Sequence, residues 1–589
     1  MQATQKATLK SADTGLQAAM RTVFWLAAEG IALSKYPSLI NLQKLQGCQP
    51  ITDKLSHAKN ATYSSLNSAE EFLACIAESI HSKILAKIKG QPFAVLTDES
   101  TDIAVTKQMI VYVKYVDGDF VPHTHFLGNL AIDNPKSDSE VLFNLLISFL
   151  TKEDLSQSNA YGFGSDGAAV MVGKRKGVAT RFKSKNGHCV SIHCLAHRLN
   201  LCTSQASKNI KYLKTFEETL SNLFYYFGGT KSGNRKCELE EIQKQLKEPL
   251  VKMKECHEIR WLAFHDAVKA VYRSWGSLTA FFKKHSDKSS KSYFESLTDY
   301  RFLVILHMMM DILPSVSQLS LIFQKTDVDV SAIQPSVDSL KEKLKNVERG
   351  KGHFQREFIE VVEKIKHKES GDLKGVKFKK VDLCFGKSFT DTAKECENIR
   401  NEFCTALLKN IEERFPSESM DIAMAFHVLG MRPLSFLSSE DRDKYGEREL
   451  QILCDHYGQD LGESEKLINS DECKAEWALV KKIVLEQSYP RERLQGLWKV
   501  LHSFHTETFP NLFKLAKLAL LMPFQTAECE RGFSCQNSIK TSRRNRLSES
   551  KLSQLMTIKI EGGPIDSFDS IESIDLWISK KELRFSKQS

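Results

Sequence analysis

The chain has 589 residues, 42% hydrophobic and 26% charged, an ordinary globular composition with enough length for two to four domains. Its 82 Lys+Arg exceed its 73 Asp+Glu by 9, a mild basic excess that favours an anionic partner only slightly. No run approaches the roughly 20 apolar residues that span a bilayer, the start lacks a signal-peptide core, and the 14 cysteines contain no CxxC pair. We therefore expect a soluble intracellular protein with reduced thiols and no membrane contact.

The periodicity of the sequence changes near residue 90. Residues 1–90 carry apolar residues at helical spacing between polar turns, which predicts an α-helical lead-in. Three runs rich in β-branched and aromatic residues follow at 93–98, 109–116 and 120–130, and the turn Asp117-Gly118-Asp119 joins the last two. These runs predict three successive strands with hairpin connections.

A helix and further strands follow this meander. Residues 141–150 have the pattern of a helix, 160–165 that of a strand leading into Asp166, and α/β alternation continues to about 204. Three strands, a helix and another strand predict a mixed α/β layer.

The rest of the chain is mostly helical in pattern. Residues 205–490 are interrupted by a Lys-rich polar stretch from Lys364 to Lys380, which we expect to be a solvated loop. The apolar helix 511–522 ends at Pro523, and a basic stretch and a last helix from Ser548 follow.

Two predicted strands end in an acid, Asp98 and Asp166. A sheet can present both carboxylates to one cleft, where oxygen ligands suit Mg²⁺. Two such ions about 3.5–4 Å apart can activate a nucleophile and stabilise the leaving oxygen in phosphodiester chemistry. Taken without their surroundings, acids at strand ends are more often solvated or capping groups.

The surrounding motifs make a specific resemblance. Five strings occur in the order found in the hAT transposase superfamily and, with Arg546-Leu547 and the terminal helix, span roughly residues 90 to 560. They are Leu96-Thr-Asp98-Glu-Ser-Thr-Asp102, Gly164-Ser-Asp166-Gly167, His193-Cys194-Leu-Ala-His197-Arg-Leu-Asn200, Arg260-Trp261, and Pro523 through Glu530-Arg531-Gly-Phe533-Ser534. The chain resembles a hAT-type transposase.

The resemblance implies an α/β plus α architecture, in which a large all-α insertion interrupts an RNase H-like mixed sheet. The expected division is a helical lead-in at 1–90, the first part of the core at 91–204, the insertion at 205–490, core completion with the hAT dimerisation region at 491–565, and a tail at 566–589. It also implies that Asp98, Asp166 and Glu530 are the catalytic and metal-binding acids, with Mg²⁺ or Mn²⁺ as the ion of an active enzyme.

Other motif residues have a structural and a functional interpretation. Cys194 and His197 match the family's Cys-x-x-His motif, and we expect a packed Cys and a His near the cleft or a phosphate rather than a zinc site. Trp261 is a core residue or stacks on an extruded base, and core packing is slightly favoured.

Basic and apolar residues near these motifs supply the expected contacts with DNA and with a second copy. The candidates for DNA, beside the alternative of a solvated face, are Arg260, Trp261, Lys174, Arg175, Lys176, Arg531, Lys540, Arg543, Arg544 and Arg546. The candidates for dimerisation, beside the alternative of simple core, are Phe509, Leu512, Phe513 and Leu515.

Three functions remain open at this stage. Retention of the three acids supports an active metal-dependent DNA transposase or nuclease. Residues 1–90 lack the Cys/His spacing of a BED/TTF-type zinc finger, which favours a domesticated, transposase-derived nuclear protein that binds DNA, dimerises and has lost transposition. The third alternative is a dimeric protein-interaction scaffold.

Overall fold

The computed structural model describes residues 2–55, 63–103, 105–132, 138–173, 175–228, 232–255, 261–366, 373–386, 388–415, 420–462, 464–542 and 544–586. Contacts divide the chain into two compact units. The sheet unit combines Met1–Cys194 with Ala425–Ser589, and the insertion unit is Leu195–Met424. The middle of the chain therefore interrupts one fold, and the structure divides the chain at other positions than the sequence suggested.

A five-stranded mixed sheet forms the centre of the sheet unit. Its strands are β1 (Phe93–Thr101), β2 (Lys107–Val116), β3 (Pro122–Ala131), β4 (Ala160–Ser165) and β5 (Val190–His193), in the order β3-β2-β1-β4-β5. The first three strands form an antiparallel meander, whereas β4 pairs parallel with both β1 and β5. This mixed sheet fits the RNase H-like fold that the resemblance implies.

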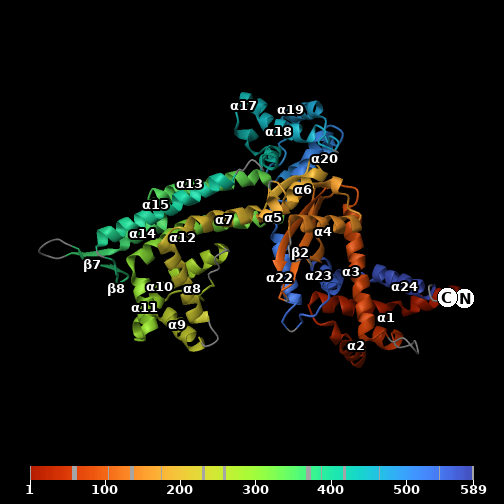
Figure 1. Cartoon of the computed structure of the whole chain (residues 1–589), viewed down its shortest axis with the longest axis horizontal. Helices are drawn as coiled ribbons and strands as arrows, with labels where there is room; N and C mark the ends of the chain where they lie inside the picture. Colours follow the sequence, from red (N-terminus) through yellow and green to blue (C-terminus); the bar gives the residue numbers. More distant parts are fainter. Residues whose placement is uncertain are drawn as a thin grey trace. The chain divides into compact units, whose positions relative to one another are not determined.

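Alternating side chains divide the sheet into two buried faces. On one face, Val95 and Val111 pack with helices α3 (Leu66–Ile88), α4 (Ser139–Lys152) and α6 (Val178–Lys185). On the other, Leu96 and Ile110 pack with Phe533 of α22 (Ala527–Ile539). Figure 1 shows α3 and α4 beside the strands. Asp98 has the same parity as Leu96 and lies on the face that α22 covers.

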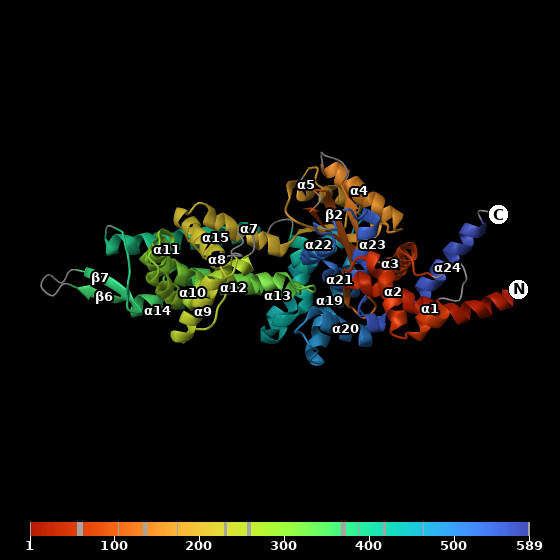
Figure 2. The same ribbon diagram turned by 90° about the horizontal axis from the view of Figure 1, so that it is seen from below.

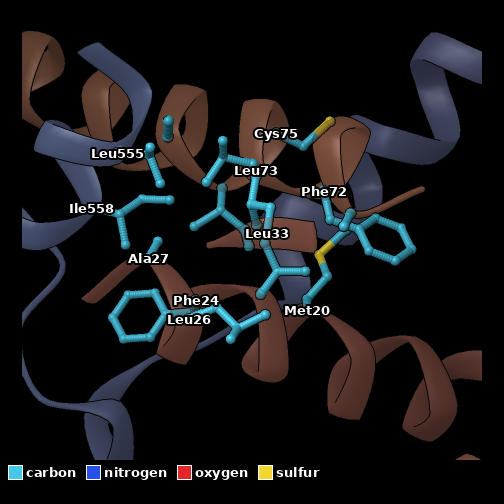
Figure 3. Packing of buried hydrophobic residues seen from close by; sticks show 14 of the residues in the cluster. Met20, Phe24, Leu26, Ala27, Leu33, Phe72, Leu73, Cys75, Leu555 and Ile558 are labelled. Atoms are coloured by element: carbon cyan, nitrogen blue, oxygen red, sulfur yellow. The ribbon is translucent and has the colours of Figure 1, made fainter. Parts of the chain in front are cut away.

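The two ends of the chain share one core. Helices α1 (Gln2–Ala28), α2 (Tyr36–Leu45) and α3 pack with α23 (Glu549–Glu561) and α24 (Ile571–Ser586). In Figure 3, Leu555 and Ile558 of α23 point toward Ala27 and Leu73 from the N-terminal helices. In Figure 2, α1 and α24 leave the sheet unit on the same side. The helical lead-in is therefore part of the sheet unit.

The sheet unit also contains the helices after the insertion. They are α17 (Ser439–Lys444), α18 (Glu447–Tyr457), α19 (Ser470–Glu486), α20 (Leu494–His505) and α21 (Pro510–Leu521), with the short helix α5 (Ala169–Val172) earlier in the chain. The α18–α19 connection lies against the segment before β5, where the Gly187 N–H donates to Ser464 Oγ at 3.2 Å and His188 Nε2 contacts the Gln459 carbonyl oxygen at 3.0 Å.

The segment that leads into α22 crosses the sheet at two glycines of β4. A Cβ on Gly162 would lie 2.8 Å from Cδ of Pro523, and a Cβ on Gly164 would lie 2.8 Å from Cβ of the same proline. The buried Lys114 ammonium of β2 donates to the Met522 carbonyl oxygen at 3.3 Å. Small residues and one buried lysine thus bring the C-terminal segment onto the sheet.

The insertion unit is mainly helical. Its helices are α7 (Leu195–Lys208), α8 (Lys211–Gly228), α9 (Gly233–Gln245), α10 (Trp261–Lys284), α11 (Lys288–Thr298), α12 (Tyr300–Phe323), α13 (Val330–Glu348), α14 (His353–Val361) and α15 (Phe389–Arg414), with α16 (Asp421–Ala425) at its end. Strands β6 (Glu363–Lys366), β7 (Leu373–Phe378) and β8 (Val381–Asp382) form an antiparallel sheet. The expected all-α insertion and the expected loop at 364–380 are both wrong here, because the described part of that stretch pairs as strands.

Of the helices that the structure describes, α12 is long and apolar enough to cross a membrane by length and composition. The expectation that no segment is long and apolar enough to span a bilayer is therefore wrong for α12. However, 83% of its most apolar window is buried inside the structure, where α12 contacts α10, α13, α14 and α15. This is also the pattern of a core helix.

Gly164→Ala tests the crossing of the sheet. The added methyl would meet both Cβ and the backbone oxygen of Pro523, at 2.8 and 3.1 Å, so we expect a loss of about 1–3 kcal/mol in the free energy of unfolding. Gly496→Ala in α20 is the matched control, since nothing lies within 4 Å of its new Cβ, and should be neutral or stabilise by up to about 1 kcal/mol. Urea denaturation measures both, and equal values would contradict the described packing.

Candidate acidic centre

Asp98 and Asp166 lie at equivalent positions on neighbouring strands. β1 and β4 pair in parallel with Leu96 opposite Gly164, and each acid follows that pair by two residues. Neighbouring strands are about 4.8 Å apart, so the two backbones present their carboxyl groups side by side at one edge of the sheet. The Asp98 Oδ1 accepts the Glu99 N–H at 2.9 Å, and the Asp166 Oδ1 accepts the Ala168 N–H at 3.2 Å.

Glu530 reaches this edge from the first turn of α22. The helix packs closely on β2 at Gly532, where a Cβ would lie 2.2 Å from Ile110 Cδ1 and 2.7 Å from the Tyr112 hydroxyl. Ile110 pairs with Asp98 across β1 and β2. Gly532 therefore permits the close approach that places Glu530, an exposed residue, near Asp98.

The three acids interact electrostatically. Burial is the largest cause that raises the pKa of Asp98, the charge of Asp166 and then those of Glu530 and Glu99 add to it, and the hydrogen bond from the Glu99 N–H opposes them, with a net pKa of about 7. Burial, with Asp98 as the first neighbouring charge, also raises the pKa of the Cys529 thiol of α22. A cation near these groups would relieve the repulsion between the carboxylates.

The donor chemistry of the centre suits a hard cation, because all three acids offer carboxylate oxygens. However, no group of three or more His, Cys, Asp or Glu side chains is arranged to hold a metal ion within the part of the chain that the structure describes. Asp98, Asp166 and Glu530 form an electrostatic cluster, and their arrangement does not enclose an ion.

A buried ion pair holds the far end of α22. Lys540 donates to the Asp102 carboxylate at 2.5 Å, and their side chains are 7% and 1% exposed. The other Asp102 oxygen accepts the Thr106 N–H at 2.9 Å in the connection between β1 and β2. The prediction that Lys540 contacts DNA is therefore wrong in this structure, because its ammonium is buried against a carboxylate.

The other predicted DNA contacts have different surroundings. The Arg544 guanidinium is half-buried and donates to the Gly30 carbonyl oxygen at 3.0 Å, and Arg531 pairs with Glu528. Arg175, Lys176 and Arg546 are exposed. Lys174, Arg260 and Arg543 lie outside the described residues, and Trp261 begins α10, although its side chain is not described.

The Cys-x-x-His motif begins beside the acidic centre. Cys194 is buried, and its N–H donates to the Ser165 carbonyl oxygen at 3.0 Å, directly before Asp166. His193 begins the same motif string but was given no role, and its ring lies close to the backbone after Asp166. A Cβ added to Gly167 would lie 2.2 Å from Cε1 of His193. His197 lies in α7, within the insertion unit.

The four predicted dimerisation residues lie in the core of a single chain. Phe509, Leu512 and Leu515 are fully buried, and Phe513 is 6% exposed. Phe513 contacts Phe120, Trp498 and His502 through ring edges. The prediction that they contact a second copy is therefore wrong for this conformation, and their alternative interpretation as core residues describes the structure.

Comparison with known proteins identifies two regions. Residues 47–177 match the family model "ZMYM1/FAM200, RNase-like domain", and residues 481–561 match the "hAT family C-terminal dimerisation region". The first match includes Asp98 and Asp166, and the second includes Glu530, so the two matched regions meet at the acidic centre.

Curated relatives match over most of the chain at low identity. The human and mouse proteins named "52 kDa repressor of the inhibitor of the protein kinase" are each 21% identical over 88% of this chain and 68% of their own length. A mouse protein named "General transcription factor II-I repeat domain-containing protein 2" is 24% identical over 25% of this chain and 16% of its own.

Asp98→Asn tests the electrostatics of the centre. A carboxyl group with a folded-state pKa of about 7 holds its proton more tightly than in the unfolded chain, where the pKa is about 3.9. The free energy of unfolding therefore falls as the pH rises from about 4 to 7, and the full cost of ionising Asp98 applies above that window. Asparagine does not ionise and has no such cost. We expect Asp98→Asn to raise the free energy of unfolding at pH 8 by about 1–3 kcal/mol, allowing for partial exposure of the side chain, and by little at pH 4.

Asp117→Asn is the control for this titration. Burial tends to raise the pKa of Asp117, but the hydrogen bonds from His123 and from the Val121 and Asp119 N–H groups lower it overall. A carboxylate with a lowered pKa stabilises the folded state at neutral pH, so this substitution should destabilise. Urea denaturation at the two pH values measures both variants. A loss of stability in Asp98→Asn at pH 8 would refute the description of the centre.

Proposed function

We propose that this chain, which matches an RNase-like domain and the hAT family C-terminal dimerisation region, is a transposase-derived nuclear protein that binds DNA and itself and no longer moves DNA. One observation carries the proposal. Exposed basic residues lie close in the sequence to the acids of the RNase H-like sheet. The printed names of the curated relatives support the loss of transposition, because one is called a repressor and the other is named for a repeat domain of a general transcription factor.

Exposed basic residues follow two of the three acids. Arg175 and Lys176 lie in the connection that leaves Asp166, between α5 and α6, and Arg531 follows Glu530 on α22. Lysine and arginine at a surface bind phosphates by releasing counterions, and such binding depends strongly on salt. These residues therefore favour contact with the DNA backbone, which positions a duplex without reading its sequence.

The dimerisation region supports self-association. Since Phe509, Leu512, Phe513 and Leu515 are buried within one chain, contacts with a second copy have to come from exposed residues of the region. Phe504 in α20 is one such residue, with 72% of its surface exposed. Exposed aromatic side chains are enriched at protein interfaces, and Phe504 is our candidate contact.

The DNA-binding proposal predicts a steep dependence on salt. In fluorescence anisotropy with a labelled duplex, replacing Arg175 and Lys176 together by alanine should weaken binding for every sequence tested. It should also lower the slope of log K against log salt by about 1–2, because about one counterion is released for each phosphate contact.

Lys474→Ala with Lys482→Ala is the matched control for this double replacement. Both lysines are exposed on α19 of the same unit, and removing them changes the net charge equally. Affinity and slope should stay close to those of the unchanged protein. Equal losses in both double variants would indicate general attraction to a basic protein rather than the proposed surface.

An active metal-dependent enzyme is the second candidate, and the electrostatic interaction of Asp98 with Asp166 and Glu530 favours it. These three residues would be the ones to hold Mg²⁺ or Mn²⁺. When bound, the ions would supply an activated nucleophile and a stabilised leaving oxygen for the cutting of a phosphodiester bond. Burial, and after it the charges of Asp166 and Glu530, keep Asp98 protonated more often near pH 7, so binding a cation would release that proton.

Nicking and strand transfer on a hairpin-forming DNA separate the two candidates. If the chain is an enzyme, activity with Mg²⁺ or Mn²⁺ should fall at least about 100-fold in both Asp98→Asn and Glu530→Gln, because each removes a carboxylate from the centre. Our proposal expects no metal-dependent activity in the unchanged protein, together with intact salt-sensitive binding. Activity that both variants abolish would overturn the claim that transposition is lost.

A further inference from the structure

The connection between β1 and β2 exposes two apolar side chains. Ile103 is 54% exposed and Val105 is 83% exposed, beyond the ends of the two strands. Single exposed apolar residues are common on protein surfaces. Two exposed apolar residues on the same tight connection are unusual, because serine, asparagine, aspartate and glycine are the usual residues of turns.

The backbone at Val105 adopts an unfavourable conformation. Its φ is +63°, in the left-handed region where a β-branched residue is a clear outlier. The Val105 N–H donates to the Asp102 carbonyl oxygen at 2.9 Å, and the Asp102 N–H donates to the Thr106 carbonyl oxygen at 3.0 Å. Glycine would fit this position without strain. Strained positions of this kind persist where the side chain has a function that glycine could not supply.

The base of the connection is rigidly anchored. The Asp102 carboxylate accepts the Thr106 N–H and pairs with the buried ammonium of Lys540 at the end of α22. A single carboxylate thus joins the two strands to the helix in the interior. Ile103 and Val105 therefore project from a fixed support, and inserting them into a partner would cost little ordering of the backbone.

The exposed pair lies at the same edge of the sheet as the acids. β1 runs from Asp98 toward Ile103, and five residues of extended chain cover roughly 16 Å, the length of about five base steps. α22 runs in the same direction, from Glu530 near Asp98 to Lys540 at Asp102. A duplex bound along this edge would meet both the acidic centre and the exposed pair.

The charges around the pair suit an anionic partner. Lys107, which pairs with Thr101 directly below the connection, is exposed. Apolar side chains beside a basic residue are the combination with which proteins enter the minor groove and unstack a base step.

We propose that Ile103 and Val105 form an apolar wedge that inserts between stacked base pairs of duplex DNA beside the acidic centre. This inference rests on the proposed DNA binding and adds the residues that deform the duplex. Lys107 contacts a phosphate beside the wedge, and the Asp102–Lys540 pair keeps the wedge in position.

The test uses the full chain and a 20-base-pair duplex with an internal 2-aminopurine, whose fluorescence rises when the base is unstacked. We expect the unchanged protein to raise the fluorescence at least about twofold. Val105→Gly and Ile103→Ser should remove this increase and raise the Kd from anisotropy about three- to tenfold. Val105→Gly is informative because glycine relieves the backbone strain, so its urea midpoint should be unchanged or higher while unstacking is lost.

Phe436→Ser is the matched control, since Phe436 is a large apolar residue of the same unit with 90% of its surface exposed. It should leave both the fluorescence and the Kd unchanged.

If the unchanged protein binds DNA in a salt-dependent manner but causes no increase in fluorescence, or if Val105→Gly retains the increase, the wedge is refuted and DNA binding stands. If the unchanged protein shows no binding by anisotropy, both proposals fail. A change in sedimentation of Val105→Gly without a change in DNA binding would assign the pair to a second copy and overturn the wedge.

Discussion

The return of the C-terminal segment to the sheet is the contact on which the rest of the sheet unit depends. An insertion of 230 residues, Leu195–Met424, separates the strands from the segment that covers them. Lys114 holds Met522, Pro523 lies on the glycines of β4, and Lys540 is buried against Asp102. Without these contacts, α22 would leave one face of the sheet exposed, and Glu530 would be absent from the acidic centre.

This constraint explains how separate stretches of sequence form one site. Parallel pairing of β1 and β4 fixes Asp98 beside Asp166, and the close packing at Gly532 adds Glu530. Burial, together with the repulsion from Asp166 and Glu530, raises the pKa of Asp98, which is a cost to folding rather than a contribution to it. The chain retains this arrangement of three acids in spite of that cost.

The sequence predicted the three strands of the meander well, because runs of β-branched residues are local signals. However, β1 continues to Thr101, beyond Asp98, which was expected to end it. The buried state of Lys540 could not be predicted, since its partner Asp102 lies 438 residues earlier. The apolar face of α21 has the same pattern whether a helix of its own chain or a second copy covers it, so the dimerisation residues were placed wrongly. Likewise, the lysines of β6 and β7 suggested a loop, although lysine is tolerated on the exposed side of a strand.

The most direct test of this account is the titration of Asp98 itself, followed by NMR of protein labelled with ¹³C in aspartate. We predict an apparent pKa of about 7 for Asp98 in the unchanged protein. It should fall in Asp166→Asn, fall less in Glu530→Gln, and change least in Glu528→Gln, a residue of the same first turn of α22 that pairs with Arg531. An unchanged pKa in both Asp166→Asn and Glu530→Gln would show that the C-terminal segment does not complete the acidic centre, and would contradict the account.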